Sequence, residues 1–240
     1  MPTDIAEANL RDRLAANSCP GRGIVAGRGE SGQWIQVYWI MGRSQNSRNR
    51  VFVREGDTLR TQAADPSKVG DPSLIICNAM RRLDQLHIVS NGAQTDGIHA
   101  TLAQGGSFTG ALAQWDHEPD APNFTPRISS LLDTAKGEIW MSVIKAGAFG
   151  APACEQHFYR YRQIDPGYGY AVTTCTGDGS PLPAFAGTPY LAPLNGDAAA
   201  IAAQYWGALD AGNRVSLGGR AVDPGSGATH TEVINQYETL

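Results

Sequence analysis

The chain has 240 residues, a formal net charge of −4, 42% hydrophobic residues and 18% charged residues. This hydrophobic fraction is ample for a buried core, and the 5 Trp, 8 Tyr and 6 Phe exclude a disordered chain. The mild acidic balance excludes a general nucleic-acid binder, whose surface would be basic.

The first half of the chain is predicted to contain short strands followed by helices. Residues 1–14 form a short amphipathic helix, and the glycine cluster at 29–32 joins the apolar runs 23–27 and 34–41 into a β-hairpin. Further strands are expected at 51–53, 74–77 and 86–90. The G-x-G-x-x-G pattern at 27–32 precedes a strand rather than a helix, which favours a hairpin turn over a dinucleotide site.

Two helices are expected in the middle of the chain. The first covers 95–104, with Thr95 or Asp96 as N-cap and Gly105 as its stop, and the second covers 107–115, with Ser107 as N-cap. Residues 128–132 continue in a helical or turn-like register.

The second half repeats this arrangement around a long Gly/Pro-rich loop at 177–193. The alternating apolar residues predict strands at 138–144, 155–164, 168–176, 214–222 and 231–234. A helix at 197–209 is capped by Asp197. Strands grouped away from the helices indicate an α+β fold with large sheets in one domain.

Three further features concern the compartment and metals. The first residues lack a basic stretch followed by an apolar run, so we expect no signal peptide, and no run approaches the roughly 18 apolar residues that cross a bilayer. The isolated cysteines favour reduced thiols and a cytoplasmic location. The histidines lack metal-site spacing, so no metal is expected.

Two segments carry the charge that a binding site would need. Arg43, Arg48 and Arg50 follow the run 34–41 without an acid among them. Guanidinium groups are well suited to bind a phosphate or a carboxylate, so we favour an anion-binding site over the alternative, a solvated basic loop. Residues 116–127 gather three carboxylates with one His and one Arg. They could supply an acid and a base, or form only a polar loop broken by prolines.

Two other features stay open or are disfavoured. Residues 90–96 join a strand to a helix, where they either make a tight turn and cap or present N–H groups to an anion or a polar heterocycle. Cys19 could be a nucleophile, but residues 1–18 precede it and leave it without a free amine, which favours a structural thiol.

Several segments together resemble the archaeal-type IMP cyclohydrolase family, in particular its bacterial branch. The likeness covers the chain from about residue 20, and its motifs lie at 20–27, 38–50, 71–76, 89–96, 121–128, 178–183 and 215–217. It implies a four-layer αββα sandwich similar to the N-terminal nucleophile hydrolases, without self-cleavage. Residues 1–18 would then be a helical extension to a single domain at 19–240.

The resemblance implies an enzyme that closes the purine ring of the formamido-imidazole carboxamide ribotide (FAICAR) to IMP with loss of water, in purine biosynthesis. The implied partner is this small purine nucleotide, without a cofactor, a nucleic acid or a membrane, and a homo-oligomer is left open. Two alternatives are a related cyclohydrolase acting on another nucleotide and a purine-nucleotide-binding protein without catalysis.

The family motifs imply roles for individual residues. Glu118 and Asp120 are expected to transfer protons, and Arg43 to act with them. The expected substrate-binding residues are Arg22, Ser44, Arg48, Arg50, Asn91, Gly92, Gln94, Thr95, Asp96, Asn123, Thr125 and Arg127. The chain departs from the pattern at Cys77-Asn78, where relatives commonly carry a tyrosine whose hydroxyl a thiol cannot replace.

Overall fold

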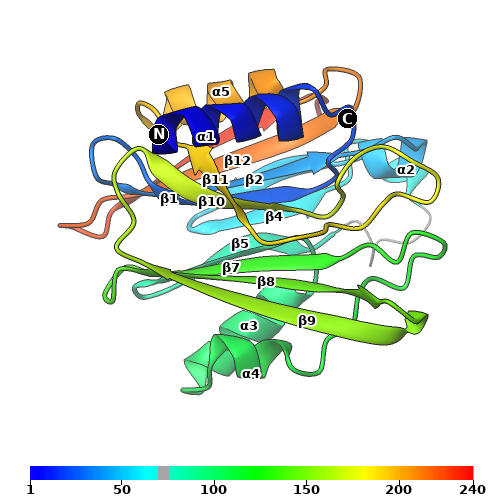
Figure 1. Ribbon diagram of the computed structural model, residues 1–240, viewed down its shortest axis with the longest axis horizontal. Helices are drawn as coiled ribbons and strands as arrows, with labels where there is room; N and C mark the ends of the chain where they lie inside the picture. Colours follow the sequence, from blue (N-terminus) through cyan, green and yellow to red (C-terminus); the bar gives the residue numbers. More distant parts are fainter. Residues whose placement is uncertain (70–75, 240) are drawn as a thin grey trace.

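The computed structural model of the protein describes residues 1–69 and 76–239, and two antiparallel sheets packed face to face form its centre (Figure 1). The six-stranded sheet has the order β11-β10-β1-β2-β12-β13. In that order the strands are Tyr190–Pro193, Tyr168–Thr173, Gly23–Arg28, Trp34–Met41, Arg214–Val222 and Thr229–Asn235.

The seven-stranded sheet runs from β3 to β9 in chain order. Its strands are Val51–Glu55, Thr58–Gln62, Asn78–Leu83, Leu86–Ser90, Arg127–Asp133, Glu138–Gly147 and Gly150–Arg162. All neighbouring strands in both sheets are antiparallel, as expected for an α+β protein with few helices.

Helices cover the outer face of each sheet (Figure 1). Helices α1 (Pro2–Asn9) and α5 (Ala198–Ala208) lie over the six-stranded sheet, while α3 (Gln94–Ala103) and α4 (Phe108–Leu112) lie over the seven-stranded sheet. The short elements are α2 (Gln45–Arg48), η1 (Leu10–Ala15) and η2 (Pro66–Lys68). No helix in the described part of the chain is long and apolar enough to cross a membrane.

The N-terminal segment belongs to the outer helical layer. The Asn9 side chain donates to the Leu191 carbonyl over 2.8 Å, and Leu14 is buried in the main core. That core lies mainly between the sheets, and a smaller apolar cluster lies beneath α3 and α4. Burying each large aliphatic side chain contributes about 1.5–3 kcal/mol, so these layers hold the sheets and their loops in place.

The structure confirms the hairpin at 23–41, the Gly105 stop and the Ser107 and Asp197 caps. Residues 128–132 are instead part of β7, so the helical interpretation was wrong. Strand β7 is buried on both faces, between the core and the helices, which removes the alternation that marks a half-buried strand.

The cap of α3 was also predicted wrongly. The helix begins one residue earlier, and its N-cap Ala93 makes no side-chain cap bond. Thr95 bonds instead to the Ser90 hydroxyl, and Asp96 accepts from Asn78 and Arg81. Residues 74 and 75 of the expected strand lie outside the described residues, and Ile76 and Cys77 are not in a strand.

Candidate functional site

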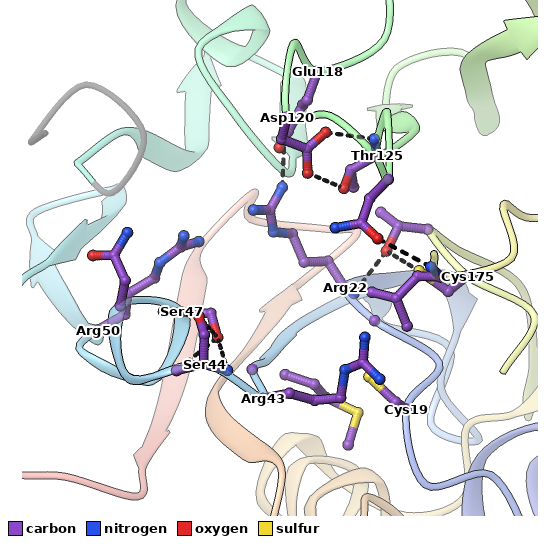
Figure 2. Close-up of a pocket in the computed structure, with 17 residues that line it drawn as sticks. Cys19, Arg22, Arg43, Ser44, Ser47, Arg50, Glu118, Asp120, Thr125 and Cys175 are labelled. Carbon is purple, nitrogen blue, oxygen red and sulfur yellow. Dashed lines mark hydrogen bonds and ion pairs between the residues drawn. The ribbon is translucent and has the colours of Figure 1, made fainter. Parts of the chain in front are cut away.

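A cavity of about 340 Å³ opens at one end of the sandwich, where the ends of several strands meet (Figure 2). The antiparallel register places the start of β1 beside the end of β10, and the end of β2 lies next to them. The loops that leave these strands, together with the loop at 116–126, line the cavity. Its lining residues include Cys19, Arg22, Arg43, Ser44, Ser47, Arg50, Glu118, Asp120, Asn123, Thr125, Thr174, Cys175 and Leu182.

A smaller chamber of about 60 Å³ adjoins this cavity, and the two share Arg50 and Glu118. We call it the inner chamber. It extends toward the space between the sheets, and its other lining residues are Tyr38, Ile40, Thr61, Cys77, Asn91, Gly92, Ala93, Pro119 and Arg127. The departure from the family pattern at Cys77 therefore lies at this chamber.

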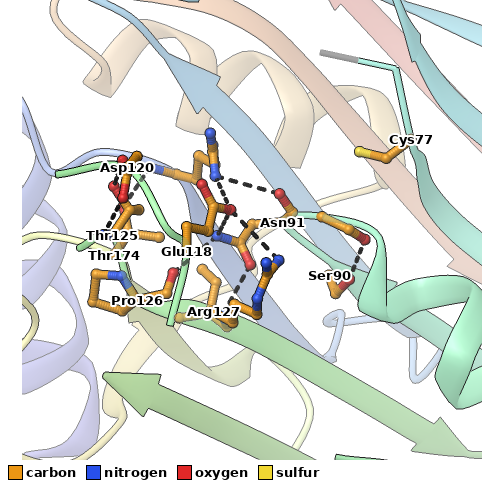
Figure 3. Close-up of polar contacts among 12 residues, drawn as sticks. Cys77, Ser90, Asn91, Glu118, Asp120, Thr125, Pro126, Arg127 and Thr174 are labelled. Carbon is orange, nitrogen blue, oxygen red and sulfur yellow. Dashed lines mark hydrogen bonds and ion pairs between the residues drawn. The ribbon is translucent and has the colours of Figure 1, made fainter. Parts of the chain in front are cut away.

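Arg22 and Glu118 form an ion pair at the junction of the two spaces; both residues are labelled in Figure 2, and Figure 3 shows the other polar contacts around Glu118. The Arg22 Nη1 donates to Glu118 Oε1 over 2.5 Å, and the side chains are 15% and 13% exposed. Burial alone would lower the pKa of Arg22, but the charge of Glu118 and this hydrogen bond outweigh it and raise the pKa above its ordinary value. Arg22 is therefore a fixed cation.

Asn91, Gln94 and Arg127 brace the same carboxylate. The Asn91 amide donates to Glu118 Oε1 over 3.3 Å and to the Pro126 carbonyl over 2.9 Å. Arg127 Nη1 lies 3.9 Å from Glu118 Oε1 and donates to Gln94 Oε1 over 3.1 Å. Burial lowers the pKa of Arg127, partly offset by Glu118. This network fixes the wall between the chamber and α3.

Arg50 differs from these arginines because its charge is unpaired. The residue is 8% exposed and lines both the cavity and the inner chamber, yet its guanidinium makes no hydrogen bond or ion pair within residues 1–69 and 76–239. Burial, together with the nearby charge of Arg22, lowers its pKa to about 10, although Tyr38 and Glu118 act in the opposite direction. A buried cation of this kind is costly unless an anion joins it.

The loop after β2 forms the cationic side of the cavity mouth. Arg43 pairs with the carboxylate of Asp178, which comes from the long loop after β10. Ser44 caps α2 by accepting from the Ser47 amide over 3.1 Å, and the Ser47 hydroxyl donates to the Ser44 carbonyl over 2.9 Å. Both serines line the cavity beside Arg43 (Figure 2).

Asp120 shapes the opposite wall. Its Oδ1 accepts from the Thr125 amide over 2.7 Å and its Oδ2 from the Thr125 hydroxyl over 2.5 Å. Asn123 accepts from the Leu182 amide over 3.0 Å, which joins this loop to the loop after β10. Both oxygens of Asp120 are thus occupied within the loop.

The structure brings most of the expected site residues together, but not all of them. Arg48 binds the Gly42 carbonyl and the Asn213 side chain and faces a groove beside Lys68. Thr95 is buried under the 90–94 turn, and Asp96 is held by Asn78 and Arg81 outside both spaces. No group of three or more His, Cys, Asp or Glu side chains in the described ranges could hold a metal ion.

Sequence reasoning missed several lining residues, including Tyr38, Ser47, Thr174, Cys175 and Leu182. Tyr38 lies on the strand just before Arg43. In the sequence it looks like an ordinary core aromatic residue, and nothing indicates that it lines a cavity. Thr174 accepts from the Arg22 amide over 3.0 Å and so holds the base of the Arg22 loop. Only the pairing of β1 with β10 brings it there.

Comparison with known proteins gives two matches. A family model described as IMP cyclohydrolase-like protein matches residues 19–226. A protein from Methanopyrus kandleri named IMP cyclohydrolase is 34% identical to the chain over 158 residues, which cover 64% of this chain and 73% of that protein. The family match spans the strands and loops that build the cavity.

Proposed function

The chain belongs to the IMP cyclohydrolase-like family, and from this premise we propose that it converts FAICAR to IMP in purine biosynthesis. The carboxamide nitrogen of FAICAR attacks the formyl carbon, and the carbonyl electron pair moves to the formyl oxygen. The resulting hydroxyl then leaves as water with a proton from the ring nitrogen. This reaction needs no oxidant and no cofactor.

The observation that carries the proposal is the unpaired charge of Arg50. Negative charge develops on the formyl oxygen during the attack, and a fixed cation in a site of low dielectric stabilises such charge strongly. Arg50 is buried, borders both spaces and forms no ion pair with the described residues. A substrate that brings negative charge to it would remove the cost of burying it.

We place the phosphate at the cavity mouth and the heterocycle toward the inner chamber. Arg43, Ser44 and Ser47 offer a cation and hydroxyl groups at the mouth, which suits a phosphate. The inner chamber includes the Glu118 carboxylate, which would repel a phosphate but can accept a hydrogen bond from the carboxamide. Arg22, Asn91 and Arg127 would position the ring.

Of the expected acid/base residues, Glu118 suits proton transfer better than Asp120. Its hydrogen bonds involve Oε1, and Oε2 makes none within the described chain, so Oε2 is available to take the proton from the attacking nitrogen. Asp120 uses both oxygens on Thr125. We therefore assign Glu118 the transfer and Asp120 the positioning of the loop.

The proposal extends to the fold and the cellular setting. We propose that the layered sandwich is of the kind found in N-terminal nucleophile hydrolases, without self-cleavage, and that residues 19–240 act as one domain with 1–18 as an extension. Purine biosynthesis from soluble intermediates places the enzyme in the cytoplasm.

The test is an absorbance assay of FAICAR cyclisation with the purified protein, run beside the spontaneous reaction. We expect IMP to form well above the spontaneous rate. IMP binding without turnover would instead support a nucleotide-binding protein without catalysis. Activity that disappears in Cys19→Ala but survives in Glu118→Gln would point to thiol chemistry and contradict the proposal.

A further inference from the structure

Tyr38 is a buried side chain whose hydroxyl makes no hydrogen bond to any residue that the structure describes. Tyr38 is 1% exposed, and its ring packs against Phe52 with the centroids 5.5 Å apart. The residue lines the inner chamber, and its hydroxyl makes no hydrogen bond in the part of the chain that the structure describes. A phenol hydroxyl at a chamber wall that bonds to no described group can bond to a molecule that enters the chamber.

The neighbours of Tyr38 are the charged groups of the proposed reaction. Arg50 and Glu118 line the same chamber, and the charges of Arg22, Arg50 and Glu118 all act on the Tyr38 hydroxyl. Burial raises the pKa of Tyr38 above its ordinary value. The phenol therefore stays protonated at neutral pH and can donate a hydrogen bond.

We propose that Tyr38 is a catalytic residue whose hydroxyl donates a hydrogen bond to the formyl oxygen of FAICAR during ring closure. This inference rests on the proposed function. As the nitrogen–carbon bond forms, the carbonyl electron pair moves to the oxygen that Tyr38 and Arg50 hold. Glu118 takes one proton from the attacking carboxamide nitrogen and passes it to that oxygen. The resulting hydroxyl then leaves as water together with a second proton from a nitrogen of the new ring. Tyr38 keeps its own proton throughout.

Tyr190 provides a matched control. Its hydroxyl is also buried and without a hydrogen bond among the described residues, but it lines neither the cavity nor the inner chamber. Tyr38→Phe and Tyr190→Phe therefore remove the same group from two buried side chains. Because neither hydroxyl bonds to a residue that the structure describes, we expect both variants to fold with unchanged melting temperatures.

The first measurement is the rate of cyclisation. We expect Tyr38→Phe to lower kcat about 100-fold with KM nearly unchanged, as when one oxyanion donor is removed. Tyr190→Phe should keep the wild-type kcat. Wild-type turnover that persists fully in Tyr38→Phe would overturn the role of Tyr38 and leave the proposed reaction intact.

The second measurement is binding, which does not depend on turnover. Xanthosine 5′-monophosphate differs from IMP by an oxygen on the carbon that ring closure takes from the formyl group. By calorimetry, Tyr38→Phe should weaken binding of xanthosine monophosphate about tenfold, as for one lost hydrogen bond, and leave IMP binding unchanged. The control should bind both like the wild type.

These two measurements separate the possible failures. A wild-type protein that binds both nucleotides with the expected dependence on Tyr38, but does not turn over FAICAR, would contradict the reaction and support the position of the hydroxyl. An unchanged ratio of the two affinities in Tyr38→Phe would overturn the inference, whatever the rates. If Tyr38→Phe does not fold, the wild type alone provides the test: equal affinity for xanthosine monophosphate and IMP would overturn the inference.

Discussion

At the scale of single residues, the arginines of the site differ in whether a protein anion neutralises them. Arg22 and Arg43 pair with Glu118 and Asp178, whereas Arg50 has no such partner among the described residues. We expect Arg50→Met to lower kcat about 100-fold, because it removes the unpaired cation from the reacting oxygen. The measurement is steady-state cyclisation of FAICAR.

Stability provides the second readout for Arg50→Met. Removing a buried unpaired charge should leave the melting temperature equal or higher, since the desolvation cost disappears with the charge. Arg54→Ala is the control, because Arg54 is exposed and lines neither space. A variant that loses stability while keeping its rate would show that Arg50 is structural.

Substitutions of the two carboxylates Glu118 and Asp120 should have different effects on kcat and on stability. Glu118→Gln keeps an acceptor for Arg22 but cannot take a proton, so we expect kcat to fall about 100-fold. Asp120→Asn weakens the bonds to Thr125 and should cost about 1 kcal/mol of stability with a smaller effect on kcat. The reverse order of the two rates would contradict the assignment.

Residue composition identified the arginine cluster, but it could not distinguish the individual arginines within it. The arginine-rich segment was expected to form an anion site, and Arg43 and Arg50 do line the cavity, but Arg48 and Arg50 looked equivalent in the sequence. The short helix α2 turns Arg48 back onto Gly42, while Arg50 lies beyond it, just before β3. Such a difference depends on one turn of backbone, which residue type alone does not fix.

At the scale of elements, the strands with clear patterns were predicted and those with mixed residues were not. Strands β4 and β5 carry arginines, and β11 is a short edge strand within the predicted 177–193 loop. Strand β11 pairs with a strand that is distant in the chain, with Tyr168 opposite Pro193, so tertiary contact rather than local propensity forms it. Strands β4 and β5 instead pair with adjacent strands across two-residue turns, and their arginines hid the strand pattern.

The turn between β2 and α2 positions the proposed phosphate site, and Gly42 is its critical residue. A Cβ at Gly42 would lie 2.7 Å from the Ser47 carbonyl carbon and 2.8 Å from its oxygen, so the backbone of α2 would have to move. We expect Gly42→Ala to raise KM for FAICAR about tenfold or more, because Arg43 and Ser44 would shift.

Gly207→Ala is the matched control for this substitution. Gly207 lies in α5, and a Cβ there would meet nothing within 4 Å. This variant should keep KM and gain up to about 1 kcal/mol of stability from higher helix propensity. If Gly42→Ala binds FAICAR like the wild type, the turn does not position the substrate.

At the scale of the whole molecule, the space between the sheets holds a polar cluster at the end opposite the cavity. Gln36 donates to the His87 carbonyl over 3.1 Å, and Arg220, paired with Gln36 across β2 and β12, binds the Asp57 carbonyl. Several residues of β2 and β6 lie between this cluster and the site, and each residue of a strand adds about 3.3 Å to the separation.

This cluster makes stability depend on pH through His87. Burial, with the nearby charges of Arg220 and Arg82 and despite Asp57, lowers its pKa to about 4 from 6.5. The unfolded chain therefore binds a proton that the folded protein does not. The stabilisation is complete above pH 6.5 and is lost as the pH falls toward 4, by about 3 kcal/mol in all.

Urea unfolding of the wild type and His87→Gln between pH 7 and pH 4 checks this expectation. Glutamine cannot take up the proton, so its free energy of unfolding should fall less steeply, by the amount assigned to His87. Carboxylates such as Glu138, whose pKa is lowered chiefly by Arg160, titrate in both proteins and cancel in the comparison. Parallel profiles would mean that His87 accepts its proton in the folded state, with the interior near Arg220 open to water.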